Sequence, residues 1–209
     1  GAHFLVDCGC ACLFASCFRA VPGRAELLLL YNFCAFALQM PIGVLFDRYG
    51  HGGFWAKIGC MLIAVTLLGG PMQLPTLRMC LAGVGNALFH AGGGVEVMHS
   101  HRKLGALGIF VSPGALGLYL GMQLTGWARL IVALALGGIG FLFPDASRRV
   151  NAPPVQWKAV FCLAGLFAVV VLRSWLGMNA QLAWKTGLFA VLAVVATALG
   201  KALGGVAAD

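Results

Sequence analysis

The chain has 209 residues, of which 61% are hydrophobic and only 10% are charged, and its mean hydropathy is +0.93. Soluble domains carry about 25% charged residues, so this composition excludes an ordinary soluble protein and indicates a surface solvated by lipid. The formal net charge of +8 comes from short basic clusters between apolar runs, which favours lipid headgroups over nucleic acid as the anionic partner.

Long apolar runs predict an all-α membrane bundle of about eight transmembrane helices. The runs approach the roughly 20 residues that cross a bilayer, whereas a barrel would show short alternating segments. Turns that contain Pro and Gly separate the runs, as at FRAVPGRAE (18–26) and GGPMQLP (69–75). In chain order, the predicted spans are the N-terminus to about 17, then 27–46, 53–68, 77–98, 104–124, 130–143, 159–176 and 182–206.

The longest polar stretch, 144–158, predicts a cytoplasmic linker between two halves. It separates a six-helix N-terminal half, 1–143, from the start of a C-terminal half, 159–209. Eight Lys and Arg residues near the span ends lie on the side of this linker and of the loop after the second span, and five lie on the other side. Because basic residues are enriched on the cytoplasmic side, the linker side is placed in the cytoplasm. We therefore expect a multi-pass protein of the cytoplasmic (inner) membrane.

A loop motif occurs twice in the chain. The second span ends in GVLFDRYGH at 43–51, and the eighth ends in GVAAD at 205–209, an offset of 162 residues. The first copy resembles the hallmark loop of the major facilitator superfamily, G-x-L-x-D-R-x-G followed by a basic residue, with His51 at the basic position. The resemblance implies two related six-helix halves, and we expect this chain to be a fragment that stops inside the second copy.

The motif residues predict a latch at the cytoplasmic end of the bundle. Gly43 permits close helix approach, and Asp47 can accept hydrogen bonds from a neighbouring helix N-terminus. The Arg48 guanidinium can pair with the carboxylate of Glu96 in the fourth span. We expect this latch to stabilise the outward-facing state; solvated interfacial charges are the alternative. Its members are Gly43, Asp47, Arg48, Gly50 and Glu96.

The fifth span contains a predicted bend. Its segment SPGALG at 112–117 resembles the Gly-Pro motif of antiporters in the superfamily, with Ser where Gly is usual. A proline frees a backbone carbonyl and glycines allow close packing, so Pro113, Gly114 and Gly117 are expected to let this helix bend. Helix packing alone is the alternative for each glycine. The motif favours export over uptake.

Ionisable residues inside the spans indicate the transport site. Charged groups within a membrane cost about 2.5–3.5 kcal/mol on translocon scales and usually face the bundle interior. His3 and Asp7 share one helix face, and a His–carboxylate pair can exchange a proton near neutral pH. We predict that Asp7 carries a coupling proton, tuned by His3 and His90, and that Asn86 lines the cavity.

Three short patterns resemble the fosmidomycin-resistance type of efflux pump in the same superfamily. In chain order they are HFLVD (3–7), FHA (89–91) and RS (173–174). Val6 and Ala91 depart from the Asn and Pro of that group. The resemblance implies that His90 lies beside the first span, and that Arg173 faces the pair across the cavity as a counter-charge or substrate contact.

The leading hypothesis is a secondary active transporter, a monomer without cofactor or metal that exports a small molecule or drug in exchange for protons. Uptake of a small nutrient by the same fold is the alternative within transport. A membrane enzyme or metal protein is disfavoured, because no nucleophile motif, Walker loop or zinc-ligand spacing occurs in the sequence. A scaffold would have no use for buried ionisable residues. The expected partners are the small-molecule substrate, protons and the lipid bilayer, not nucleic acid.

Overall fold

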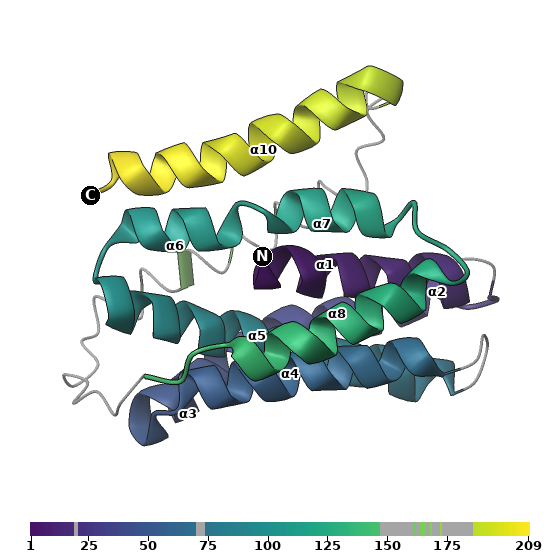
Figure 1. Ribbon diagram of the computed structural model, residues 1–209, viewed down its shortest axis with the longest axis horizontal. Coiled ribbons are helices and arrows are strands. Elements are labelled where there is room, and N and C mark those ends of the chain that lie inside the picture. The colour runs from purple at the N-terminus through teal and green to yellow at the C-terminus, as the bar shows by residue number, and fades with distance from the viewer. Residues whose placement is uncertain are drawn as a thin grey trace. The chain divides into compact units, whose positions relative to one another are not determined.

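The computed structural model describes residues 1–18, 21–69, 74–146, 161, 164–165, 168, 172 and 186–209. Every regular element in these residues is helical, in agreement with the predicted all-α class (Figure 1). The chain divides into two compact units, Gly1–Val150 with Val194–Asp209, and Asn151–Ala193. The description below concerns the first unit, which contains the candidate site.

The described helices follow the predicted spans closely. The largest difference at a boundary is five residues, at the start of the last helix, Gly187 against a predicted 182. The predicted seventh span and most of the predicted linker lie outside the described residues. In chain order, the elements are α1 (Ala2–Leu13), the π-helix η1 (Phe14–Phe18), α2 (Arg24–Asn32), the π-helix η2 (Phe33–Ala37), α3 (Gln39–Tyr49), α4 (Gly52–Leu68), α5 (Pro75–His101), α6 (Leu104–Val111), α7 (Gly114–Gly121), α8 (Ala128–Leu142) and α10 (Gly187–Ala207).

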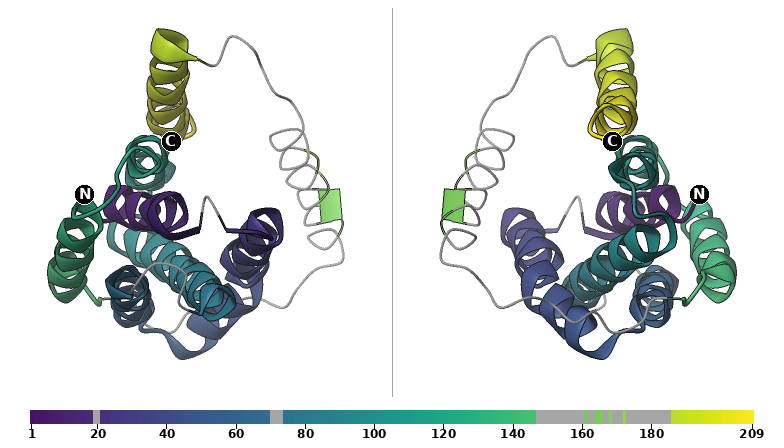
Figure 2. Two further views of the ribbon diagram at one scale, coloured as in Figure 1. Left: turned by 90° about the vertical axis from the view of Figure 1, so that its right-hand side faces the viewer. Right: turned by 90° about the vertical axis from the view of Figure 1, so that its left-hand side faces the viewer.

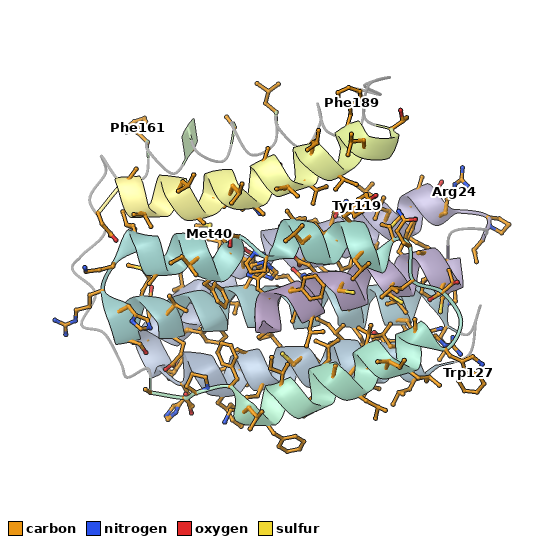
Figure 3. The ribbon with its side chains drawn as sticks, turned by 45° about the horizontal axis from the view of Figure 1, so that its top comes forward. Arg24, Met40, Tyr119, Trp127, Phe161 and Phe189 are labelled. Atoms are coloured by element: carbon orange, nitrogen blue, oxygen red, sulfur yellow. The ribbon has the colours of Figure 1, made fainter. Side chains whose placement is uncertain are left out.

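In the described part of the chain, three helical stretches are long and apolar enough to cross a membrane: Arg24–Tyr49, Leu104–Gly121 and Gly187–Ala207, with 26, 18 and 21 residues. Three further apolar helices are shorter, Ala2–Phe18, Gly52–Leu68 and Ala128–Leu142. Large apolar side chains cover the outer surface, and Figure 3 shows Trp127, which is 82% exposed, projecting away from the ribbon. Such a surface is stable in lipid and costly in water.

Sharp turns and helix ends are set by a few residues. Between α3 and α4, Gly50 has φ +76° and His51 has φ +62°, so the chain reverses through two residues with positive φ. Glycine adopts this backbone without a Cβ penalty, which explains its place in the 43–51 motif. Pro75 begins α5 at a position where its missing N–H is not needed.

Helix α5 is the centre of the bundle, and α1, α2, α3, α4 and α6 all contact it (Figure 2). Glycines bring α4 and α5 together at backbone distance. A Cβ added at Gly85 would lie 2.8 Å from the Gly59 carbonyl oxygen, and one at Gly59 would lie 2.8 Å from the Phe89 nitrogen. Small residues on facing helices allow such close packing when lipid supplies no hydrophobic driving force.

Arg78, near the start of α5, is buried and holds the end of α4. Its Nε donates to the Thr66 carbonyl at 2.9 Å, and its Nη2 donates to the Gly69 carbonyl at 3.2 Å. The guanidinium also lies 5.1 Å from the centre of the Phe18 ring. Helix C-termini carry unpaired carbonyls and partial negative charge, so this cation caps α4.

Candidate functional site

Four polar side chains from two helices meet inside the bundle. His3 and Asp7 lie one turn apart on α1, and Asn86 and His90 lie one turn apart on α5. His3, Asp7 and Asn86 are 4%, 7% and 2% exposed, and the His90 side chain is 19% exposed. Because residues four apart share a helix face, each helix turns both of its polar groups toward the other.

The reactive atoms of the cluster are close together. The Nε2 atoms of His3 and His90 are 2.9 Å apart. The Asp7 carboxylate presents Oδ2 to His3 Nε2 at 3.3 Å and Oδ1 to His90 Nε2 at 3.8 Å. The Asn86 amide donates to Asp7 Oδ1 at 3.4 Å. Two imidazoles and one carboxylate therefore point at a common centre.

The backbone assigns the tautomer of His90. Its Nδ1 lies 2.9 Å from the Asn86 carbonyl oxygen, which can only accept a hydrogen bond. Nδ1 therefore carries the proton, and Nε2 of the neutral ring offers its lone pair to the cluster. Two buried atoms, His3 Nδ1 and Asn86 Oδ1, have no hydrogen-bond partner. Buried polar atoms are costly without a partner, so these two atoms can each take a hydrogen bond or a ligand contact.

Aromatic rings and a glycine enclose the cluster. The His3 ring is in edge-to-face contact with the rings of Phe89 and Phe110, at centroid distances of 5.8 Å and 5.1 Å. Above His3 and Asp7 lies Gly114 of α7: a Cβ there would collide with the Asp7 carboxylate and lie 2.6 Å from His3 Nε2. The enclosure lowers the local dielectric and strengthens every charge interaction inside it.

The predicted fifth span is broken at Ser112 and Pro113 into α6 and α7 (Figure 1). Pro113 has no N–H to donate to the Ile109 carbonyl, and the Ser112 hydroxyl donates to that carbonyl instead, at 3.1 Å. Gly117, one turn on, packs against α1: a Cβ there would collide with the Phe4 carbonyl oxygen. The break thus depends on Pro113, while Gly114 and Gly117 provide the contact with α1.

The predicted latch residues are not joined to one another in this conformation. Within the described residues no ion pair links Arg48 to Glu96, and the Arg48 guanidinium lies over the neighbouring Tyr49 ring at 5.7 Å. Glu96 accepts a hydrogen bond from the Ala146 nitrogen at 2.8 Å. Nothing described lies within 4 Å of a Cβ built on Gly43. The latch stays a prediction.

Asp47 is exposed and lines an open cavity of about 260 Å³ at the same end of the bundle. The other lining residues come from α5 and α6, and they are Gly94, Val95, Met98, His99 and Leu107. Apart from Asp47 and His99 the lining is apolar.

Asp209 occupies the aspartate position of the second motif copy, and its carboxylate accepts two backbone hydrogen bonds. Its Oδ1 accepts from the Leu104 nitrogen at 2.6 Å and its Oδ2 from the Gly105 nitrogen at 3.0 Å. These nitrogens belong to the first two residues of α6, whose amides have no acceptor within the helix, so Asp209 caps the N-terminus of α6. Gly108 of α6 packs closely against Gly205 of α10: a Cβ added at Gly108 would lie 2.9 Å from the Gly205 Cα. This packing holds the two helices together. We call this contact the Asp209 cap.

Among the residues predicted for the site, the structure brings together His3, Asp7, Asn86 and His90. Arg173 lies outside the described residues. Sequence reasoning recognised the motif copy at 205–209 but did not include Asp209 among the site residues; the repeat itself was the available signal. It also did not foresee a possible metal-ligand set in His3, Asp7 and His90, because the ligands are far apart in the chain.

No known protein family, no curated protein and no solved structure was found to match this chain significantly. The resemblance to the major facilitator superfamily therefore rests on the sequence motifs alone.

Proposed function

We propose that this chain belongs to a secondary active transporter of the major facilitator type, which exports a small molecule by alternating access and draws on an ion gradient. The observation that carries the proposal is the buried cluster of His3, Asp7 and His90 in a bundle whose outer surface is apolar. The proposed location is the cytoplasmic membrane, with the chain as a multi-pass monomer.

The energetics favour a functional role for the cluster. An ionisable group inside a membrane helix costs about 2.5–3.5 kcal/mol on translocon scales, and such groups usually mark ion or substrate pathways. Leu or Phe at these positions would fill the same space without that cost. The proposal requires that an ion binds at Asp7. The sequence predicts that this ion is a proton, and that assignment stays a prediction.

Two features of the fold support alternating access. The break at Ser112 and Pro113 lies next to Gly114, which covers the cluster, so bending there would open the cluster to solvent. The Asp209 cap joins the end of α10 to the start of α6 through two hydrogen bonds to backbone amides. Contacts of this kind can form in one conformation and open in the other.

Export is favoured over uptake by the Ser-Pro-Gly segment of the fifth span, which resembles the antiporter motif. Uptake of a nutrient by the same fold is the second candidate. The cluster also argues against a purely structural role, because a scaffold gains nothing from two buried ionisable side chains, His3 and Asp7, beside a half-buried third, His90.

Transport of ethidium out of proteoliposomes under an imposed ion gradient tests the proposal. Asp7→Asn keeps the shape of the side chain and removes its charge, so driven transport should fall about tenfold or more, the scale of a typical coupling free energy. Glu26→Gln, which alters an exposed carboxylate in the first turn of α2, is the matched control and should transport normally. Equal driven rates for Asp7→Asn and the native chain would refute the role of the cluster. Failure of the native chain to move ethidium would refute drug export.

A further inference from the structure

We propose that His3, Asp7 and His90 form a binding site for a divalent first-row transition-metal cation, for which Zn²⁺ is the probe. One carboxylate oxygen and one nitrogen from each ring all lie within 4.8 Å of one another, and the three residues come from α1 and α5. The inference concerns the ligand of the cluster and does not depend on the direction or existence of transport.

The spacing of the donor atoms fits a tetrahedral ion. Zinc bonds of about 2.0–2.1 Å to nitrogen and oxygen place neighbouring ligand atoms about 3.3–3.5 Å apart in a tetrahedron. The two Nε2 atoms are 2.9 Å apart, and the Asp7 carboxylate reaches His3 Nε2 through Oδ2 at 3.3 Å and His90 Nε2 through Oδ1 at 3.8 Å. With one ligand atom from each residue, the three donors lie within 4.8 Å of one another, a spacing close to that of a tetrahedral site.

The surroundings of His90 already have the form of a metal-ligand environment. A ligating histidine usually donates its other ring N–H to a carbonyl or carboxylate, which fixes the ring and directs its lone pair at the ion. His90 Nδ1 lies 2.9 Å from the Asn86 carbonyl oxygen, and the free Nε2 faces Asp7 and His3. The backbone of α5 therefore orients this ring for coordination.

The fourth position has a candidate donor beside it. Asn86 Oδ1 is buried and has no partner, while the same amide group touches Asp7 through its nitrogen. The oxygen and nitrogen of an amide are assigned from hydrogen bonding, and rotation of the Asn86 side chain would present the oxygen to the ion. Asn86 is 2% exposed, and its unpartnered oxygen among the described residues is the second observation that favours a cation here.

The ligand chemistry selects the class of ion. Two imidazole nitrogens favour Zn²⁺, Co²⁺ or Ni²⁺ over Mg²⁺ and Ca²⁺, which prefer six or more oxygens. Asp7 would neutralise one of the two positive charges, and its ion pairs in the described part of the chain are both with histidines. The carboxylate is thus available to an ion that displaces the contact between the two rings.

Isothermal titration of the full chain in detergent, purified without a polyhistidine tag, tests this site with Zn²⁺. One ion per chain should bind, and His90→Gln should weaken binding by at least about tenfold, since even the loss of a second-shell partner costs that much. His101→Gln, at the exposed end of the same helix, should bind as tightly as the native chain. Excess Mg²⁺ should not compete.

A variant that fails to fold would lose binding for the wrong reason, so circular dichroism accompanies each titration and His3→Gln provides a second ligand deletion. The visible spectrum of bound Co²⁺ adds a readout of geometry, because four-coordinate and six-coordinate Co²⁺ differ in colour and intensity. Absence of Zn²⁺ binding by the native chain, equal binding by both ligand variants, or a six-coordinate Co²⁺ spectrum would overturn the proposal. None of these results bears on ethidium export, which is measured without metal.

Discussion

Backbone contact between α7 and α1 gives a quantitative prediction at Gly117. A Cβ at this position would collide with the Phe4 carbonyl oxygen and lie 3.0 Å from the Phe4 carbonyl carbon and 3.1 Å from the Cys8 nitrogen. Backbone atoms cannot rotate away as a flexible side chain can, so Gly117→Ala must separate the two helices. Overpacking of this kind costs about 1–3 kcal/mol, and the backbone contact places Gly117→Ala near the upper end.

The control is Gly138→Ala on α8, where an added Cβ meets no atom of the described residues within 4 Å. Both substitutions gain the same helix propensity, about 0.8–1 kcal/mol, so the difference between them isolates the collision. About 3 kcal/mol corresponds to roughly 6–12 °C in Tm for a chain of this size. Thermal unfolding in detergent, followed by tryptophan fluorescence, measures both variants. A Tm for Gly117→Ala equal to or above that of Gly138→Ala would refute the backbone contact.

Two further predictions concern the α6–α7 break and the Asp209 cap. Ser112→Ala leaves the exposed Ile109 carbonyl without its hydroxyl donor and should destabilise the chain by about 0.5–1.5 kcal/mol in thermal unfolding, whereas Ser112→Thr retains the donor and should not; equal stability of the two variants would contradict the bond. Asp209→Ala removes the acceptor of two amides at the start of α6, so hydrogen exchange at Leu104 and Gly105 should become about 2- to 30-fold faster, and unchanged exchange would count against the cap.

The positions of the helices could be predicted from the sequence because apolar runs and their Gly and Pro boundaries are local signals. The pairing of His3 with Asp7 was equally local, since residues four apart share a helix face. The π-helices η1 and η2 could not be predicted in this way, because an added residue in a helical turn leaves no mark on composition.

Contacts between residues far apart in the sequence could not be predicted from local sequence patterns alone. The approach of His90 to Asp7 was expected only through the family resemblance, and its distance and tautomer needed the backbone of α5. The Asp209 cap depends on the packing of α10 against α6. The repeated motif draws attention to Asp209 but does not predict which helix it contacts. For Arg48 and Glu96, opposite charge at one end of the bundle does not by itself decide contact: Arg48 is exposed, whereas Glu96 is buried and accepts a hydrogen bond from the Ala146 nitrogen.

The close contact of α7 with α1 has a mechanical consequence. Because Gly117 meets backbone atoms of α1, a small slide of α7 would press its larger side chains into that backbone, so the two helices must move as one rigid piece. Helix α6 is tied instead to the end of α10 by Asp209. Relative motion of these two pieces would be absorbed at Ser112 and Pro113, the break beside Gly114. In the proposed transport cycle, the angle between α6 and α7 would then set how far water reaches Asp7.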